Sequence, residues 1–162
     1  MSRHFILLLD TSGSMYGEAG EKILGLNQAV ANILDGLRAI VPEPRLTTIT
    51  FGGSPVVQDF TSVGVTPETY EARGRDCLVE AVSLAAEIAA QKDEPVVTVL
   101  LTDGAINNPK IFANNPQLGP IYTIGIGVDA DYEQLARFTG SAETVFPPYE
   151  AEGLPGYALA KE

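Results

Sequence analysis

Three features of this sequence predict an α/β fold with a mostly parallel, doubly wound sheet. Two largely apolar runs, 5–9 and 96–101, are each followed closely by an aspartate. Runs of this kind are typical of central parallel strands that are covered on both faces. Strand-like and helix-like segments also alternate along the chain, as right-handed crossovers between parallel strands require.

The first half of the chain predicts one long helix and a hairpin. Apolar residues recur at helical spacing from about Glu18 to Val41, and the prolines that follow end the helix. The segment 45–51 is strand-like, and a Gly-Gly-Ser-Pro turn leads to a second strand over 56–60. The strand over 56–60 is therefore expected to return as an antiparallel edge strand.

The second half continues the alternation. The predicted elements are a helical turn over 67–70, helices over 78–91 and 131–138, a loop over 107–119, and strands over 121–126 and 145–146. The last segment, 147–162, has a weak pattern that does not place it. With no internal repeat and no linker, we expect one domain over 1–162, with a core over about 4–146 and a C-terminal tail.

Composition narrows the classes of partner. The 162 residues are 45% hydrophobic and carry a net charge of −11, from 21 acids and 10 bases. This balance argues against nucleic acid and anionic membranes and favours cations or basic surfaces. The single cysteine, Cys77, excludes an internal disulfide, and the apolar run at the N-terminus is too short for a signal peptide or a membrane span. We therefore expect a cytoplasmic protein.

Two aspartates mark a candidate metal site. Asp10 and Asp103 follow the two central strands, and the carboxyl ends of such strands meet at the edge where open α/β sheets bind ligands. Ser12 and Ser14 add two hydroxyls, because alternate residues of an extended loop point the same way. An all-oxygen site of this kind favours hard divalent cations. The alternative is that both aspartates are ordinary polar residues at strand ends.

The segment 10–14 has the form Asp-x-Ser-x-Ser, and 102–104 reads Thr-Asp-Gly. In this order and context the chain resembles the von Willebrand factor A-type (VWA) domain over about residues 4–146. It also resembles the intracellular bacterial branch with the tellurite-resistance TerY-type proteins. The resemblance implies a Rossmann-like, six-stranded sheet of order 3-2-1-4-5-6 with one antiparallel edge strand, flanked by helices. It also implies a metal-ion-dependent adhesion site (MIDAS) that binds Mg²⁺, with Ca²⁺ or Mn²⁺ as alternatives.

One loop departs from the family pattern. Where the family carries threonine in a Gly-x-Thr-x-Leu stretch, residues 74–78 read Gly-Arg-Asp-Cys-Leu, so that Asp76 replaces the threonine. Three carboxylates around a divalent cation leave a net charge of about −1, which favours the metal but repels an acidic ligand. Alternatively, Asp76 caps the helix that follows it. The expected metal ligands are Asp10, Ser12, Ser14, Asp76 and Asp103.

The preferred function is a non-enzymatic module that binds a protein partner through the metal, where the partner supplies an acidic or other oxygen ligand. The first alternative is a metal-dependent phosphate-ester hydrolase with Asp10 as nucleophile. Against it, Ser12 stands where such enzymes carry a second aspartate, and no lysine lies in the loops expected near the site. His4 is the only histidine, so no Ser-His-Asp triad is available. The second alternative is a metal-independent scaffold subunit that docks through the edge strand 56–60, in a bacterial stress-response or signalling complex.

Overall fold

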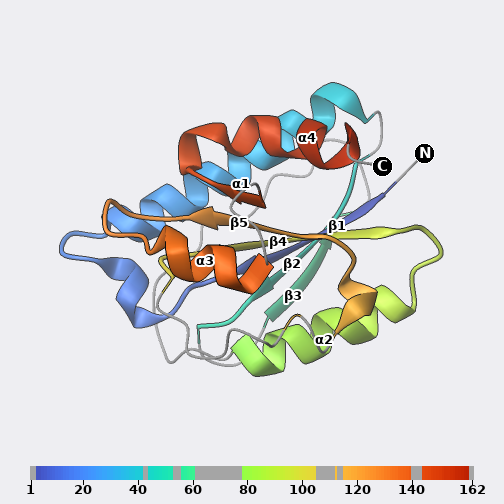
Figure 1. Cartoon of the computed structure of the whole chain (residues 1–162), viewed down its shortest axis with the longest axis horizontal. Helices are drawn as coiled ribbons and strands as arrows, with labels where there is room; N and C mark the ends of the chain where they lie inside the picture. The colour runs from blue at the N-terminus through green and yellow to red at the C-terminus, as the bar shows by residue number, and fades with distance from the viewer. Residues whose placement is uncertain are drawn as a thin grey trace.

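A single six-stranded sheet forms the centre of the molecule in the computed structural model (Figure 1). The structure describes residues 3–41, 44–52, 78–104, 112, 115–137, 139 and 144–160, together with the backbone of 56–60 and 138. The strands are β1 (His4–Leu9), β2 (Arg45–Thr50), β3 (Val56–Phe60), β4 (Val96–Thr102), β5 (Ile121–Gly125) and β6 (Val145–Phe146). Their order is β3-β2-β1-β4-β5-β6, and only the β2–β3 pair is antiparallel. The predicted strand order and antiparallel edge strand are confirmed.

Helices cover both faces of this sheet (Figure 1). They are α1 (Glu21–Ile40), α2 (Leu78–Ala90), α3 (Tyr132–Thr139) and α4 (Leu154–Ala160), with 3₁₀ turns η1 (Gly13–Tyr16), η2 (Pro116–Leu118) and η4 (Pro148–Gly153). Helices α1 and α4 pack on one face, and α2 and α3 pack on the other. None of the helices that the structure describes is long and apolar enough to cross a membrane.

The central strands are apolar on both sides because both of their faces are covered. Along β1, Phe5, Leu7 and Leu9 belong to the core beneath α1. Ile6 and Leu8 belong to the core beneath α2. Every residue of β1 and β4 is buried, which explains the continuous apolar runs that predicted these two strands.

The segment 147–162, which the sequence pattern did not place, contributes to the core. It forms η4 and α4 beside α1 on the same face of the sheet, where Ala151, Leu154 and Ala158 are buried and Tyr157 packs against Tyr122 of β5. The backbones touch at Gly36 of α1, where a Cβ atom would lie 2.1 Å from the carbonyl oxygen of Glu152. The absence of a side chain at this position therefore sets how closely η4 approaches the helix.

Helix α1 begins later than the sequence predicted, at Glu21. Gly17 and Gly20 precede it with φ of 68° and 80°, a left-handed conformation that glycine adopts readily and that interrupts the helix. The carboxylate of Glu21 accepts two backbone hydrogen bonds from this loop, at 3.0 and 2.8 Å. The consequence is that Lys22 stands in the first turn of α1, at the carboxyl edge of the sheet.

Candidate metal centre

The two aspartates predicted to meet do lie at the carboxyl edge of the sheet. Leu9 of β1 is in register with Leu101 of β4, and the Asp10 amide donates a 2.9 Å hydrogen bond to the Leu101 carbonyl. Asp103 follows directly after β4. Asp10 is only 2% exposed and Asp103 only 7%. Both carboxylates are therefore largely removed from solvent between the two central strands.

Asp10 is held by hydrogen bonds on both of its oxygens. Its Oδ1 accepts from the Ser12 amide at 3.0 Å and the Ser12 hydroxyl at 2.5 Å, and its Oδ2 accepts from the Thr102 hydroxyl at 2.6 Å. An ionised carboxylate only accepts hydrogen bonds, so both hydroxyls donate to it. The lone pairs of the Ser12 oxygen are left for another group, and the Ser14 hydroxyl lies 3.2 Å from it.

The loop that brings Ser14 to Ser12 is not fully extended, contrary to the prediction. Ser12 is extended, with φ −64° and ψ 163°, but the chain then enters η1. The Met15 amide donates to the Ser12 carbonyl at 2.9 Å, and the Met15 side chain is completely buried. Burial of this side chain accounts for the tight turn, which returns Ser14 to the same side as Ser12.

Burial dominates the electrostatics of Asp10. It raises the pKa of the Asp10 carboxyl, outweighing the hydrogen bonds from Ser12 and Thr102 that lower it, and the charge of Asp103 adds to the rise. Among the residues that the structure describes, no Lys, Arg or His forms an ion pair with Asp10. Asp10 is thus a buried anionic group that a nearby cation would stabilise.

Two residues of this site were not recognised from the sequence. Thr102 belongs to the Thr-Asp-Gly motif, but the sequence did not predict a role for it as a site residue, and its hydroxyl donates to Asp10. Lys22 corrects the expectation that no lysine lies near the site, because its Nζ is 3.3 Å from Asp103 Oδ2. The same Nζ is 3.1 Å from Asp129 Oδ1. Partial burial opposes the charge of Lys22, but Asp129 and Asp103 together outweigh it and raise the pKa of the ammonium.

The donor set matches a hard divalent cation. Asp10, Ser12, Ser14 and Asp103 supply oxygens only, as Mg²⁺, Mn²⁺ and Ca²⁺ prefer. Within the described part of the chain no three acidic, His or Cys side chains cluster as a metal site. This agrees with a centre built from two carboxylates and two hydroxyls. The predicted third carboxylate, Asp76, lies outside the described residues, as do Cys77 and the predicted helical turn over 67–70.

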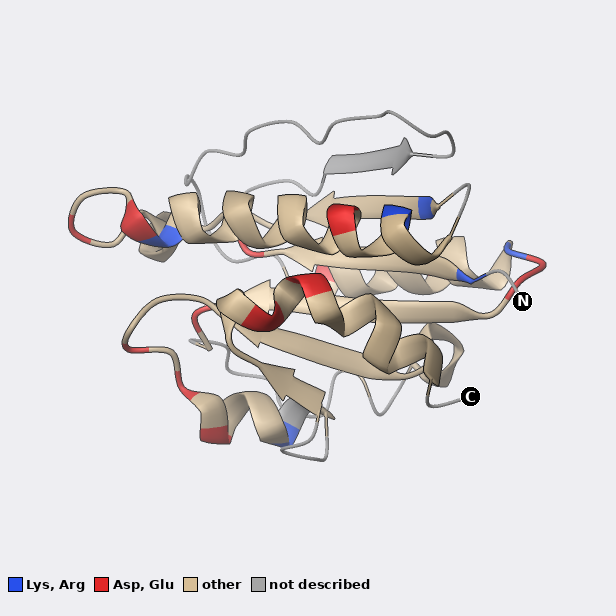
Figure 2. Ribbon diagram, turned by 90° about the horizontal axis from the view of Figure 1, so that it is seen from above, with Lys and Arg blue, Asp and Glu red and all other residues tan. Residues whose placement is uncertain are grey.

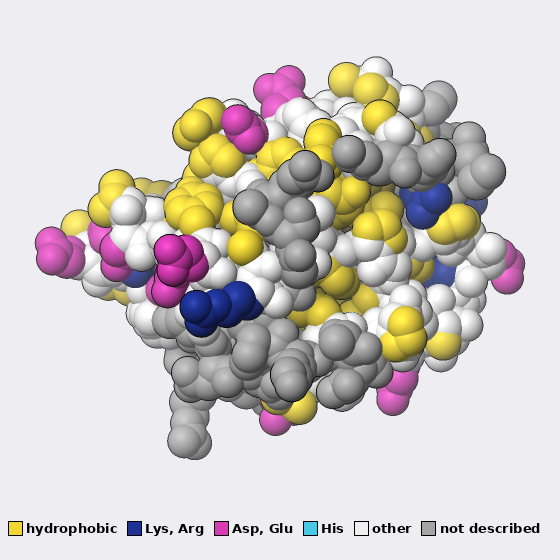
Figure 3. Space-filling view, viewed as in Figure 1, with side chains coloured by type: hydrophobic (Ala, Val, Ile, Leu, Met, Phe, Trp, Pro, Cys, Tyr) yellow, Lys and Arg dark blue, Asp and Glu magenta, His cyan; other side chains and the backbone are white. Residues whose placement is uncertain are grey.

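A groove opens next to these residues. It has a volume of about 610 Å³ and includes Lys22, Glu18 and Glu21 from the start of α1 and Val128 and Asp129 from the loop after β5. Figure 2 shows acidic residues on both of these segments, at the same end of the sheet. Acidic side chains also gather at the left end of the space-filling view in Figure 3. Lys22 therefore belongs to both places: it lines the groove and forms an ion pair with Asp103 of the candidate centre.

The fold and the position of the site define a class of protein. The strand order reverses between β1 and β4, and open α/β sheets bind ligands at such a switch point. The molecule is thus a doubly wound α/β domain with an acidic, hydroxyl-lined site at that point. Its architecture is the VWA fold, as comparison with solved structures shows.

Solved structures match this chain over almost its whole length. A von Willebrand factor type A protein from Catenulispora acidiphila shares 17% identity with a TM-score of 0.67, over 94% of this chain and 40% of that protein. Manganese-loaded TRAP protein from Plasmodium vivax shares 18% identity with a TM-score of 0.70, over 94% of this chain and 71% of that protein. Proximal thread matrix protein 1 from the mussel byssus was solved with a zinc-occupied MIDAS motif. It shares 17% identity with a TM-score of 0.68, over 97% of this chain and 46% of that protein.

These likenesses establish the fold. No family model matches the sequence, and no curated protein matches it. The chain spans less than half the length of the Catenulispora and mussel proteins. The resemblance to the VWA fold is therefore confirmed by structure, at sequence identities too low to transfer a partner.

Proposed function

We propose that this chain is a metal-dependent interaction module that binds a protein partner through a divalent cation at the carboxyl edge of its sheet. The observation that carries this proposal is the buried Asp10, whose oxygens orient two hydroxyls while no described cation pairs with it. Two neighbours with the same fold hold manganese or zinc, which supports a divalent cation here. Mg²⁺ is our first choice because hydroxyl and carboxylate oxygens suit it.

The site residues would hold the metal in two ways, as direct ligands and as hydrogen-bond partners of the ligands. The Ser12 and Ser14 hydroxyls and the Asp103 carboxylate are the direct oxygen donors. Asp10 acts chiefly by accepting the hydroxyl protons, so that the lone pairs of the Ser12 oxygen face the cation. In other metal sites, residues that hydrogen-bond to the ligands orient them in the same way. Asp76 remains a proposed ligand, on the strength of the family pattern alone. The bound cation would supply a positive charge with a position open to an oxygen of the partner.

A non-enzymatic role is our preference over phosphate-ester hydrolysis. Asp10 is almost inaccessible, and both of its oxygens already accept hydrogen bonds, which disfavours nucleophilic attack by this residue. Lys22 removes one of the arguments against a hydrolase, so the question calls for a direct test. Turnover of a generic phosphate ester that needs Mg²⁺ and is lost in Asp10→Ala would overturn the preference.

The finer parts of the proposal concern the partner and the location. We propose a cytoplasmic protein, which the single cysteine supports, and a partner among bacterial stress-response or signalling proteins, which the TerY-type resemblance supports. A metal-independent scaffold is the competing function. Partner binding that survives EDTA would favour the scaffold.

The first test is calorimetric titration of the EDTA-stripped protein with Mg²⁺, Ca²⁺ and Mn²⁺. We expect one saturable site, abolished in Asp10→Ala because the site loses a buried negative charge and the acceptor that orients the Ser12 hydroxyl, and weakened about tenfold in Ser12→Ala, which removes one neutral oxygen donor. Asp35→Ala is the matched control, since Asp35 is exposed on α1 away from the site. Circular dichroism should show a folded Asp10→Ala protein. Unchanged metal binding by that variant would refute the site.

A further inference from the structure

We propose that the Lys22 ammonium is a built-in cation of the metal centre, which pairs with both Asp103 and Asp129 in the metal-free protein and keeps only Asp129 when a divalent cation binds. This inference rests on the proposed metal site and adds a competitor to it. Lys22 would lower the affinity for the metal while stabilising the metal-free fold.

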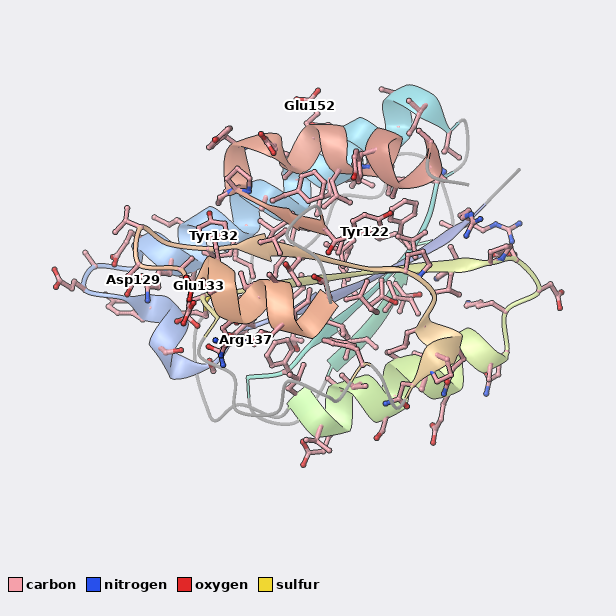
Figure 4. The ribbon with its side chains drawn as sticks, in the orientation of Figure 1. Tyr122, Asp129, Tyr132, Glu133, Arg137 and Glu152 are labelled. Atoms are coloured by element: carbon pink, nitrogen blue, oxygen red, sulfur yellow. The ribbon has the colours of Figure 1, made fainter. Side chains whose placement is uncertain are left out.

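The geometry shows one ammonium shared by two carboxylates of different kinds. Lys22 Nζ is 3.3 Å from Asp103 Oδ2, and 3.1 and 3.2 Å from the two oxygens of Asp129. The Asp103 side chain is only 6% exposed, whereas that of Asp129 is 67% exposed. Figure 4 shows Asp129 on the loop beside the start of α1. One partner therefore belongs to the candidate metal centre, and the other faces solvent.

The position of Lys22 is costly unless the ion pair compensates for it. A cation in the first turn of a helix opposes the helix dipole, which favours anions there. The aliphatic stem is also accommodated closely: a Cβ atom at Gly127 would lie 3.1 Å from Lys22 Cε, and Gly127 has a φ of 94°. The stem of Lys22 therefore packs closely against Gly127 in the loop after β5.

The ammonium also has room to move. Lys22 and Asp129 both line the groove of about 610 Å³, so Nζ can leave Asp103 and remain paired with Asp129 without repacking the core. A divalent cation bound to Asp103 would repel an ammonium within about 4 Å of it. The two cations therefore compete for the same carboxylate, and Asp129, which already pairs with Lys22, retains the displaced ammonium.

The test compares metal binding and metal-free stability in Lys22→Met, which removes the charge and keeps most of the stem. We expect Lys22→Met to bind Mn²⁺ or Mg²⁺ about tenfold more tightly than wild type. In EDTA the same variant should melt at a lower temperature than wild type, because buried Asp103 loses the positive charge that Lys22 supplies. Saturating metal should reverse this order. Lys92→Met is the matched control, since Lys92 lies before β4 at the opposite edge of the sheet.

A second variant tests the role of Asp129. Asp129→Asn should weaken metal binding several-fold in wild type, because Lys22 then has no second carboxylate, and should have no effect in the Lys22→Met background. An equal effect in both backgrounds would show that Asp129 acts through its own charge and would overturn its assigned role.

The outcomes separate this inference from the metal site itself. If wild type binds metal and Lys22→Met binds it equally or more weakly, the competing role of Lys22 is refuted and the metal site stands. If only Lys22→Met binds metal, the Lys22 ammonium fully prevents metal binding in wild type, and the inference is supported. If neither protein binds metal, both the metal site and the competition between Lys22 and the metal are refuted.

Discussion

The two edges of the sheet both bury polar side chains, yet their charges are arranged differently. At the amino edge, His4 is 1% exposed, and its Nε2 lies 2.6 Å from the Thr47 hydroxyl. Its Nδ1 lies 3.5 Å from Glu94, which in turn pairs with Arg45 at 3.0 Å. At the carboxyl edge, Asp103 pairs with Lys22 at 3.3 Å, whereas no Lys, Arg or His among the described residues forms an ion pair with Asp10.

The difference concerns what each edge still lacks. At the amino edge, the Glu94 charge is matched by Arg45, and the buried imidazole of His4 has a hydroxyl partner in Thr47. Within the described residues of the carboxyl edge, Asp10 has hydrogen-bond donors but no paired cation, so its negative charge is not matched there. A balanced network stabilises a fold, whereas a surplus of one charge in a buried site is suited to binding a ligand.

The largest effect is expected from a matched pair of threonine substitutions, one at each edge. Thr102→Val removes the donor to Asp10 Oδ2, and Thr47→Val removes the partner of His4 Nε2; both threonines are completely buried. Both changes should destabilise the protein by about 1–3 kcal/mol. Only Thr102→Val should also weaken metal binding, by about 10- to 100-fold.

Urea unfolding in EDTA and calorimetric metal titration of the two variants give the two readouts. Equal loss of metal affinity in Thr47→Val would remove the distinction between the edges.

A second prediction concerns packing near the amino edge, where α1 ends. Gly36→Ala would place a methyl group 2.1 Å from the Glu152 carbonyl oxygen and should cost about 1–3 kcal/mol, because backbone must move. Gly25→Ala is the matched control, since its methyl group would meet only the Ile126 side chain at 3.5 Å. That change should stabilise α1 by about 0.5–1 kcal/mol. Opposite shifts in the thermal midpoint of the two variants would agree with this account; equal shifts would contradict it.

The smallest effect is expected from pH at the amino edge. Burial of Glu94 opposes its ionisation, but Arg45 and the charge of His4 outweigh it and lower the pKa of Glu94. A lowered folded-state pKa contributes stability above the unfolded value of 4.5, and that stability is lost as pH falls through the folded value. The difference in urea midpoint between wild type and Glu94→Gln should therefore shrink from about pH 6 to about pH 3.

Glu87→Gln serves as the control for this titration, because Glu87 is exposed on α2. A wild-type advantage over Glu94→Gln that does not change with pH would show that the Glu94 charge contributes nothing.

The sequence was sufficient to predict the sheet and the meeting of Asp10 with Asp103. Both follow from local patterns, since long apolar runs identify central strands and parallel strands end at a common edge. The role of Lys22 could not be predicted in this way. Its contact with Asp103 depends on where α1 begins and on a loop more than 100 residues away that carries Asp129.

The C-terminal segment was missed for a different reason. Pro148, Gly153 and Pro155 are residues that usually interrupt helices, and they hid a 3₁₀ turn followed by a short helix. A signal was present in Ala151, Leu154 and Ala158, whose spacing is helical and whose side chains are buried. Patterns as short as this one are hard to distinguish from irregular structure without knowledge of the helix on which they pack.

The hydrogen bond from Thr102 to Asp10 has a consequence for how the protein folds. It joins residues 92 positions apart in the chain, so it forms only after β4 has docked against β1. Contacts between distant parts of a chain form late, because the entropy of closing a long loop must be overcome first. The binding site should therefore be absent from early folding intermediates, and metal should slow unfolding far more than it speeds folding.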